Sequence, residues 1–548
     1  MPMNVNRRTL LGGAAAAGLG LVGGAGLAAC SPGTGSPGSG ASEGPSGAVE
    51  LPAYIPYTGV EPDAPATDTG AAPYFAKFPA EPVQFTDGKP MAGGEVNILT
   101  FLNTTPTPVE RNPWWQDINA ALGGTMTFTG APVGEYPSKF QVVVAGNDIP
   151  DLAVIMAGAV PQVGRLLQAK FADLSPYLSG DKIKDYPGLA NIPTVAWRGC
   201  VFNKGIYTLP IQRFSLNRCW ITRVDLAEKY GVDPQPKNGD ELLTFLRGLT
   251  HPDQKVFATA HLWGLVDLFH EMHGTPNQWA VGEDGTFTKD YETDAYKAVL
   301  EVAAQVWKER LVHPEGFDPN ITLKTQDMYN NGMTPFFPGV ASWSGNAIAA
   351  LKADPAAQSV ALKVNTWDGS NPAGRWLNSG APYLTAIKQA SPERIQEMLR
   401  VANYLASPFG TKEYVLYQYG AEGRDFTLED GVPVPNPDSA PNRPSPMIYA
   451  GAPAMIHNGT VNPEVSRNEY EAEVLGMATA VPLPTVGLES ATDQSKGAAL
   501  TREMKDLAAD IIQARKPLSA WDEGVKEWRN DGGDKIREEY QEAYQAAQ

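Results

Sequence analysis

Strands and helices alternate along the chain from residue 94 onwards, and this order restricts the possible folds more than any other feature. Residues 94–101 alternate between apolar and polar side chains, which predicts a strand. Two more strands are predicted at 125–129 and 151–156, and the second of these leads into a helix at 160–169. Such alternation is typical of an α/β fold with a largely parallel sheet.

The middle and the end of the chain are more helical. Apolar residues at helical spacing predict helices over 292–311 and 391–405. Between them, residues 334–337 predict a strand that enters a loop at 339–343. The charged C-terminus, 521–548, is predicted to be helical. The α/β pattern therefore continues through the whole second half of the chain.

The first 29 residues read as an export signal. Arg7 and Arg8 precede a stretch of Ala, Gly, Leu and Val without a charge, and small residues stand before Cys30. The paired arginines indicate the twin-arginine route, which exports folded proteins. Leu27–Cys30 resembles the bacterial lipobox, which implies a diacylglycerol on the Cys30 sulfur and a location on the outer face of the cytoplasmic membrane. Two acyl chains are enough for stable anchoring.

The segment after the predicted cleavage site looks like a tether. Residues 30–92 are rich in Gly, Ser, Pro and Ala and show little periodic apolar pattern. We expect a flexible linker here, with an ordered stretch near Tyr74 and Phe75. The globular body then comprises residues 93–548, and signal, linker and body are the three predicted regions.

Composition excludes some partners of this body. The 548 residues carry 43 Lys and Arg against 61 Asp and Glu, a formal net charge of −18. Such an acidic chain is not expected to bind nucleic acid or anionic lipid headgroups through its surface. We expect a monomer.

The cysteines are few. With Cys30 lipidated, Cys200 and Cys219 remain in an oxidising compartment. A disulfide and two separately buried thiols are both compatible with the sequence, which does not show whether the two residues come close.

The sequence contains no motif for catalysis or for a cofactor. A Gly-x-Gly-x-x-Gly at Gly18 lies inside the export signal and follows no strand, and the P-loop and the nucleophile elbow are absent from the sequence. His270 and His273 stand three apart, where a zinc protease helix needs four, and we expect neither these residues nor His261 to bind a metal. We expect no cofactor and no enzyme activity.

Tryptophans are more informative. The chain has 12 of them, and several fall in predicted loops. Sugar rings stack their apolar C–H faces on indole, while polar side chains read the hydroxyl groups around the rim. The alternative, and for any single tryptophan the more common case, is a place in the hydrophobic core.

Six segments in order resemble the motifs of the extracellular solute-binding proteins of ABC importers. They are Gly146–Leu152, Phe171–Leu178, Gly205–Pro210, Trp220–Gly231, Tyr419–Gly423 and Trp521–Tyr544. The first two look like the Gly-Asp-x-Pro-Asp and Leu-x-Asp-Leu-x-x-Tyr signatures. The third looks like the Gly-x-x-Tyr-Gly-x-Pro segment, with Thr208 in place of the usual glycine. The last two resemble the long subgroup that includes alginate-type oligosaccharide binders.

This resemblance implies a two-lobed, type II periplasmic-binding-protein-like α/β fold with hinge strands between the lobes. It also implies that a sugar or oligosaccharide is held in the interlobe cleft and delivered to the permease subunits of an ABC transporter. Long members of the family often bind calcium after the helix that resembles Val224–Tyr230. Here residues 251–256 offer one carboxylate, so a calcium site is not expected.

Ligands of open α/β sheets lie beyond the carboxyl ends of the strands. That rule favours Trp114 and Trp115 after the first strand, residues 156–159 after the third, and residues 339–346 after the strand at 334–337. The predicted ligand-binding residues are Trp114, Trp115, Arg213, Trp279, Trp343, Trp376 and Glu422. Tryptophans are expected to stack on sugar rings, and Arg213 and Glu422 to recognise hydroxyl groups. An ion pair that braces the hinge is an equally good explanation of Arg213 and Glu422.

Two other functions remain compatible with the sequence. A lipid-anchored carbohydrate-active enzyme would need a pair of carboxylates, such as Asp290 and Glu292. A sensory lipoprotein would bind the same ligands without transport.

Overall fold

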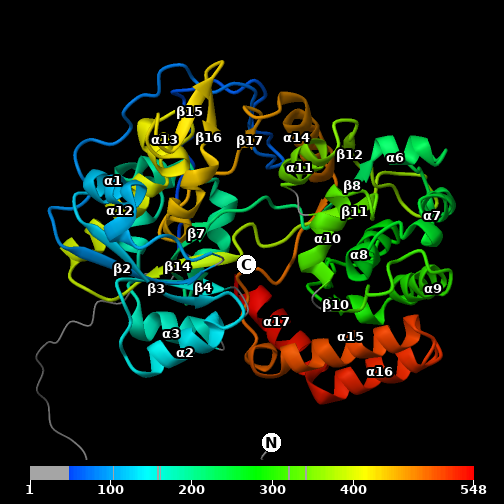
Figure 1. Cartoon of the computed structure of the whole chain (residues 1–548). Coiled ribbons are helices and arrows are strands. Elements are labelled where there is room, and N and C mark those ends of the chain that lie inside the picture. The colour runs from blue at the N-terminus through cyan, green and yellow to red at the C-terminus, as the bar shows by residue number, and fades with distance from the viewer. Residues whose placement is uncertain are drawn as a thin grey trace, which may run out of the picture. The chain divides into compact units, whose positions relative to one another are not determined.

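The computed structural model describes residues 49–102, 104–156, 160, 162–318, 321–339 and 342–547. The predicted export signal, the paired arginines and Cys30 lie outside the described residues. The rest of the chain forms one compact unit, built around two β-sheets (Figure 1).

The larger sheet has five strands in the order β3-β2-β4-β14-β7. Their bounds are β2 Glu95–Leu102, β3 Thr125–Pro132, β4 Leu152–Met156, β7 Thr208–Ile211 and β14 Tyr383–Ile387. β2 pairs in parallel with both β3 and β4, which confirms the three predicted strands and their direction. β14 runs antiparallel to both β4 and β7.

Helices cover both faces of the large sheet. They are α1 Pro113–Leu122, α2 Tyr136–Ala145, α3 Val163–Lys170, α12 Pro392–Leu405 and α13 Lys412–Tyr419, with the short α4 Ser175–Leu178 and α5 Pro187–Ala190. The chain passes from β2 to β3 on one side of β2, and then from β3 to β4 on the other side of β2. Right-handed crossovers therefore place α1 and α2 on opposite faces (Figure 1).

The smaller sheet has three antiparallel strands in the order β11-β8-β12. Their bounds are β8 Cys219–Arg223, β11 Phe336–Gly339 and β12 Ser359–Ala361. The helices around it are α6 Val224–Lys229, α7 Gly239–Gly248, α8 Leu262–Met272, α9 Asp294–Lys308, α10 Ile321–Asn330, α11 Ser344–Ala353, α14 Pro463–Met477, α15 Ala498–Ile512, α16 Ala520–Trp528 and α17 Asp534–Ala547. The predicted helices at 292–311, 391–405 and 521–548 correspond to α9, to α12 and to α16 with α17.

Each sheet has its own hydrophobic core. One large cluster of buried side chains surrounds the five-stranded sheet. Two further clusters lie on the small sheet, one under α7, α8, α9 and the C-terminal helices, and the other under α10, α11 and α14. Separate cores of this kind are what two layered α/β bodies require.

Two segments cross between the sheets side by side. Residues 212–218 follow β7 and lead to β8, while residues 377–382 lead back to β14. They hydrogen-bond as an antiparallel pair, with Arg213 N to Gly380 O at 2.8 Å, Asn378 N to Ser215 O at 2.8 Å and a bridge between Leu216 and Leu377. We call this pair the crossing ladder.

Residues 49–92 differ from the prediction of a flexible linker. They lie along the body as an extended segment, here called the strap. β1 (Tyr74–Phe75) pairs in parallel with β17 (His457–Asn458), and Ala53 N donates to Gly180 O at 3.1 Å. Backbone hydrogen bonds, rather than a periodic apolar face, hold the strap against the body. Because such bonds leave no pattern in the sequence, composition alone suggested a flexible linker.

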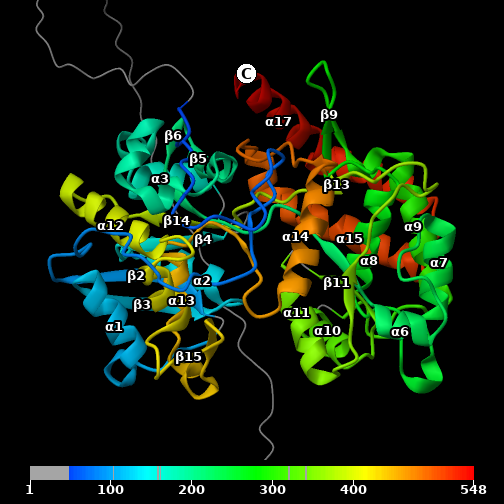
Figure 2. The ribbon, with the colours of Figure 1, turned by 90° about the horizontal axis from the view of Figure 1, so that it is seen from above.

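The remaining strands form two-stranded ribbons. These are β5 Val201–Phe202 with β6 Gly205–Ile206, β9 Trp279–Val281 with β10 Phe287–Lys289, β13 Arg375–Trp376 with β18 Ala480–Val481, and β15 Phe426–Glu429 with β16 Val432–Pro435. β13 lies beside α14 (Figure 2). It also contacts α8 and the crossing ladder, because Trp376 N donates to Glu271 Oε1 at 3.0 Å and Asn217 N donates to Trp376 O at 2.8 Å. Among the described residues, no helix is both long and apolar enough to span a membrane.

Candidate ligand-binding site

The predicted tryptophans are packing residues in this structure. Trp114, Trp115, Trp279, Trp343 and Trp376 are between 0 and 8 % exposed. Trp114 and Trp115 lie in α1 rather than in the predicted loop, because Asn112 caps the helix and Pro113 occupies its first turn. Their indole N–H groups donate to the carbonyls of Leu416 at 2.8 Å and Met126 at 2.9 Å.

The other three tryptophans belong to the core of the small sheet and its edges. Trp343 lies under α11, and Trp279 contacts the rings of Phe287, Trp528 and Tyr540. Trp376 donates from its indole to Thr275 O at 3.1 Å and stacks on His270. The structure therefore does not bring the five indoles together as a platform for sugar rings. Glu422 is exposed in the turn before β15 and makes no contact with Arg213 among the described residues.

The order of the large sheet locates the favoured place for a ligand. β3 and β4 lie on either side of β2, so the direction of the crossovers reverses between β2 and β4. The carboxyl ends of strands at such a switch point form a crevice in which open α/β sheets bind their ligands. Phe101 lies at the end of β2 and Met156 at the end of β4.

An aromatic cluster occupies this edge. Tyr383 begins the antiparallel strand β14, so its first residue lies opposite Met156 and Ile211, the last residues of β4 and β7. The Tyr383 ring lies 4.9 Å from Phe101 and 5.6 Å from Tyr449, measured between centroids. Phe101 and Tyr449 are buried, whereas Tyr383 is partly exposed.

Arg213 completes the cluster and is the one predicted residue found at this edge. It follows β7 by two residues, is partly exposed, and holds its guanidinium carbon 5.7 Å from the centroid of the Tyr383 ring. We call Phe101, Tyr383, Tyr449 and Arg213 the edge cluster. Its exposed members combine an aromatic face, a phenol and a cation, which are the groups that recognise a polar ring with hydroxyl or acidic substituents.

Tyr383 and Tyr449 were missed by the sequence analysis. The alternating run Tyr383–Ile387 is a recognisable strand, but its direction in the sheet is not written in the sequence. Only an antiparallel strand brings its first residue to the edge where the parallel strands end. Tyr449 reaches the same place from a 3-10 turn, for which the sequence carries no periodic signal.

A buried charge cluster lies next to the crossing ladder. His457, fully buried, contacts Glu469 Oε2 with Nδ1 at 2.9 Å and Glu473 Oε2 with Nε2 at 2.7 Å. Phe214 of the ladder stacks on the imidazole with centroids 4.6 Å apart. The same carboxylates accept from Ser344 N at 2.7 Å and from strap residue Ala72 at 2.9 Å. This His457 cluster therefore joins the strap, the ladder, α11 and α14.

The three histidines that the sequence offered as metal ligands have structural roles. His261 accepts from Gly264 N as the N-cap of α8, and burial lowers its pKa to about 4. His270 contacts Thr275 Oγ1 inside the core, where burial lowers its pKa to about 3. His273 contacts the carbonyl of Phe269. Within the described part of the chain, no group of three or more His, Cys, Asp or Glu is arranged to hold a metal.

Cys200 and Cys219 are free thiols in different cores. Cys200 belongs to the core of the large sheet and Cys219 to that of the small sheet. Of the two possibilities that the sequence left open, the structure shows separately buried thiols. Burial raises the pKa of Cys200 to about 12 and that of Cys219 to about 11.

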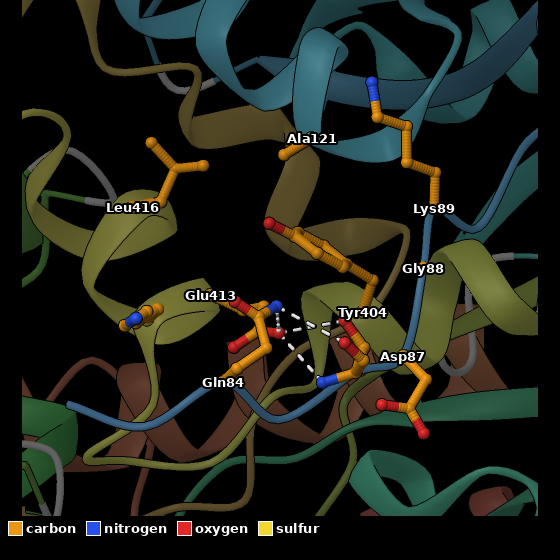
Figure 3. A pocket seen from close by; sticks show the side chains of 10 residues that line it. Gln84, Asp87, Gly88, Lys89, Ala121, Tyr404, Glu413 and Leu416 are labelled. Carbon is orange, nitrogen blue, oxygen red and sulfur yellow. Dashed lines mark hydrogen bonds between the residues drawn. The ribbon is translucent and has the colours of Figure 1, made fainter.

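A cavity of about 480 Å³ is lined by the strap, α13, Ala121 of α1 and Tyr404 of α12 (Figure 3). The buried carboxylate of Glu413 accepts from Gln84 Nε2 at 2.6 Å, Thr86 N at 2.8 Å and Phe85 N at 3.1 Å. These bonds hold the strap against the body. The cavity contains none of the predicted ligand-binding residues, and we assign it to the packing of the strap.

Comparison with known proteins supports the fold. No family model matches the chain. Lipoprotein LipO of Bacillus subtilis is 22% identical over 482 residues, which cover 82% of this chain and 92% of LipO. The alginate-binding protein AlgQ2 superposes with a TM-score of 0.59 at 17% identity, over 85% of this chain and 100% of AlgQ2.

A second solved structure is similar to this chain in fold. An HMO-binding, ABC-transporter-associated solute-binding protein from Bifidobacterium longum infantis superposes with a TM-score of 0.60 at 15% identity, over 84% of this chain and 99% of that protein. The chain has the α/β fold of extracellular solute-binding proteins. The resemblance seen in the sequence motifs is confirmed at this level, as is the predicted fold class.

Proposed function

We propose that this chain is a lipid-anchored, extracytoplasmic solute-binding protein that captures a sugar or oligosaccharide and delivers it to the permease of an ABC importer. The edge cluster carries the proposal, because it places an accessible tyrosine and an accessible arginine at the switch point of the large sheet. The similarity to an alginate-binding and an HMO-binding protein supports a saccharide as ligand.

The mechanism requires binding and release but no bond-breaking step. A sugar ring stacks its C–H face on Tyr383, while the phenol and Arg213 supply hydrogen bonds to its rim. The crossing ladder is the hinge about which the two sheets close over the ligand. The permease then distinguishes the closed, loaded form from the open one.

Ligand binding is expected to stabilise the folded chain. A bound saccharide at 100 times its dissociation constant adds about 2.7 kcal/mol to the free energy of unfolding and raises the melting temperature. Tyr383→Ala is expected to remove most of that shift, while Tyr383→Phe keeps the part due to stacking. Thermal shift against a panel of acidic and neutral oligosaccharides measures this.

Tyr54→Ala is the matched control, since Tyr54 is an exposed tyrosine on the strap. Its ligand-induced shift should equal that of the wild type. If no saccharide raises the melting temperature, the proposed ligand class is wrong.

Anchoring is tested separately through Cys30. We expect the wild type to incorporate labelled palmitate and to sediment with membranes, because two acyl chains bind a bilayer stably. Cys30→Ser should lose the label and appear in the medium, whereas the neighbouring Ser31→Ala should behave as the wild type. Membrane retention of unlabelled Cys30→Ser would contradict a lipid anchor at this residue.

A further inference from the structure

Residues 450–456 form a further crossing between the two sheets, next to the crossing ladder. They leave the core of the large sheet and lead to β17 and α14. Met455 N in this crossing donates to Gln212 Oε1 of the ladder at 3.0 Å. We call the part of the chain around the five-stranded sheet the large body, and the part around the three-stranded sheet the small body.

The strap is bound to the large body at both of its ends. At its start, Tyr57 N donates to Asn191 Oδ1 at 2.8 Å. At its end, Met91 N donates to Leu122 O of α1 at 2.9 Å, and the Met91 side chain is buried in the core of the large sheet. Both partners belong to the large body, as does Glu413, which holds the strap at α13.

Between these two ends the strap is bound to the small body. Ala71 is 1 % exposed and belongs to the core under α10, α11 and α14. Ala72 N donates to Glu473 Oε2 at 2.9 Å, and the Tyr74 hydroxyl donates to Pro463 O at 2.9 Å, both on α14. Figure 2 shows this part of the strap, in dark blue, beside α14. The strap therefore leaves the large body, binds the small body and returns.

The return from the small body to the large body has little slack. Phe75 pairs with Asn458 of β17, and its ring centroid lies 4.8 Å from that of Phe409, which follows α12 on the large body. Phe78 packs on the same Phe409 ring, with centroids 5.3 Å apart. Three residues of extended chain span at most about 11 Å. The small body therefore cannot move far from the large body here unless one of these contacts breaks.

We propose that the strap limits how far the two bodies move apart about the hinge. Closure about the hinge bends the crossing segments, whereas separation of the bodies has to pull the buried Ala71 and Tyr74 away from the small body. The inference goes beyond the proposed function, in which the crossing ladder alone is the hinge. It gives residues 49–92 a role apart from their connection to the anchor, because the strap sets how far the two sheets separate before they close over a ligand.

The test measures the distance between the two bodies without any ligand. Spin labels are attached to Gln141→Cys on α2 of the large body and to Glu301→Cys on α9 of the small body, both at exposed positions, in the full chain with Cys30→Ser. Cys200 and Cys219 are buried and do not take the label. Pulsed electron–electron double resonance then gives the distribution of the distance between the two labels.

Two substitutions in the strap release the small body through different contacts. Tyr74→Ala removes a buried ring together with its hydrogen bond to Pro463 O, and Ala71→Asp places a charge in the core of the small body. In each variant we expect the distance distribution to broaden and to extend to longer distances than in the wild type. Asp68→Ala, at an exposed turn of the strap, is the control and should give the distribution of the wild type.

The outcomes separate this inference from the proposed function. If both released variants give the distribution of the wild type, the strap does not restrain the two bodies and the inference is wrong. Melting temperatures show whether each variant is folded, and if one is unfolded the other decides. If the distributions broaden but no saccharide raises the melting temperature of the wild type, the proposed ligand class is wrong and the role of the strap stands.

Discussion

Arg375→Met is expected to lower the free energy of unfolding by about 4 kcal/mol, the largest effect of a single substitution that we predict. The Arg375 guanidinium contacts Glu271 Oε2 at 2.6 Å and donates to the carbonyl of Arg218 at 2.6 Å. It also lies over the ring of Trp220. Both side chains of the ion pair are buried, so methionine leaves the Glu271 carboxylate without a counter-charge inside the core.

The free energy of unfolding of Arg375→Met should also depend on pH, in a direction that follows from the pKa of Glu271. Burial raises the pKa of Glu271, and the Arg375 guanidinium opposes this rise. Without Arg375 the pKa of Glu271 rises further, so the folded variant is more stable with Glu271 protonated than with Glu271 charged. Its stability is present below the pKa of an unfolded glutamate and is lost as pH rises through the folded value. The destabilisation should therefore be smaller at pH 5 than at pH 8.

Urea denaturation of the wild type and of two further variants measures this effect. Arg515→Met removes a more exposed pair with Asp510 and should cost about 0.5 kcal/mol. Arg375→Met combined with Glu271→Leu replaces both charges by apolar groups and should recover part of the loss. Equal losses in Arg375→Met and Arg515→Met would show that the buried pair does not contribute in this way.

His457→Gln is expected to remove a pH-dependent part of the stability. Both ring nitrogens of His457 contact carboxylate oxygens, and only the imidazolium form has two N–H donors for them. Burial acts to lower the pKa of His457, but the hydrogen bonds to Glu469 and Glu473 outweigh it and raise the pKa above its ordinary value of 6.5.

The direction of the effect follows from that raised pKa. The stability from the charged cluster is fully present below the unfolded pKa of 6.5 and is lost as pH rises through the higher folded pKa. At pH 6, His457→Gln should cost about 3 kcal/mol, because two buried carboxylates lose their cation. The cost should shrink as pH rises, since the wild type loses the imidazolium as well.

Chemical denaturation at several pH values between 6 and 9 tests this prediction. His313→Gln is the control. Burial lowers the pKa of His313, so the contribution of His313 to the free energy of unfolding changes only as pH falls. The alkaline loss of stability should persist in His313→Gln and be absent from His457→Gln. If His457→Gln retains the alkaline loss of stability, the imidazolium of His457 is not its cause.

Predictions from the sequence succeeded where the signal was local. The alternation at 94–101 gave β2 to within a residue at each end, because one buried face imposes a period of two. Ser391 and Pro392 begin α12, where the serine hydroxyl accepts from Arg394 N. The motifs were informative for a similar reason, since each lies within a single stretch of chain.

The predictions that differ from the structure depended on distant partners. Trp114 and Trp115 were placed in a loop beside a ligand, but in α1 they face the large core and donate to carbonyls of other elements. The strap has no apolar period, and its position depends on acceptors such as Glu413, more than 300 residues away. The pattern of residues along the sequence does not show which distant residues form such pairs.

The sequence by itself determined the alternation of strands and helices, the parallel direction of the first three strands, the motifs of a solute-binding protein and the expected anchor at Cys30. Only the tertiary structure decided which side chains meet at the edge of the large sheet. Arg213 was predicted, yet its neighbour Tyr383 depends on β14 running antiparallel beside β4 and β7. The direction and register of β14 are set by its packing against strands far away in the chain, and the alternating pattern of Tyr383–Ile387 does not contain them.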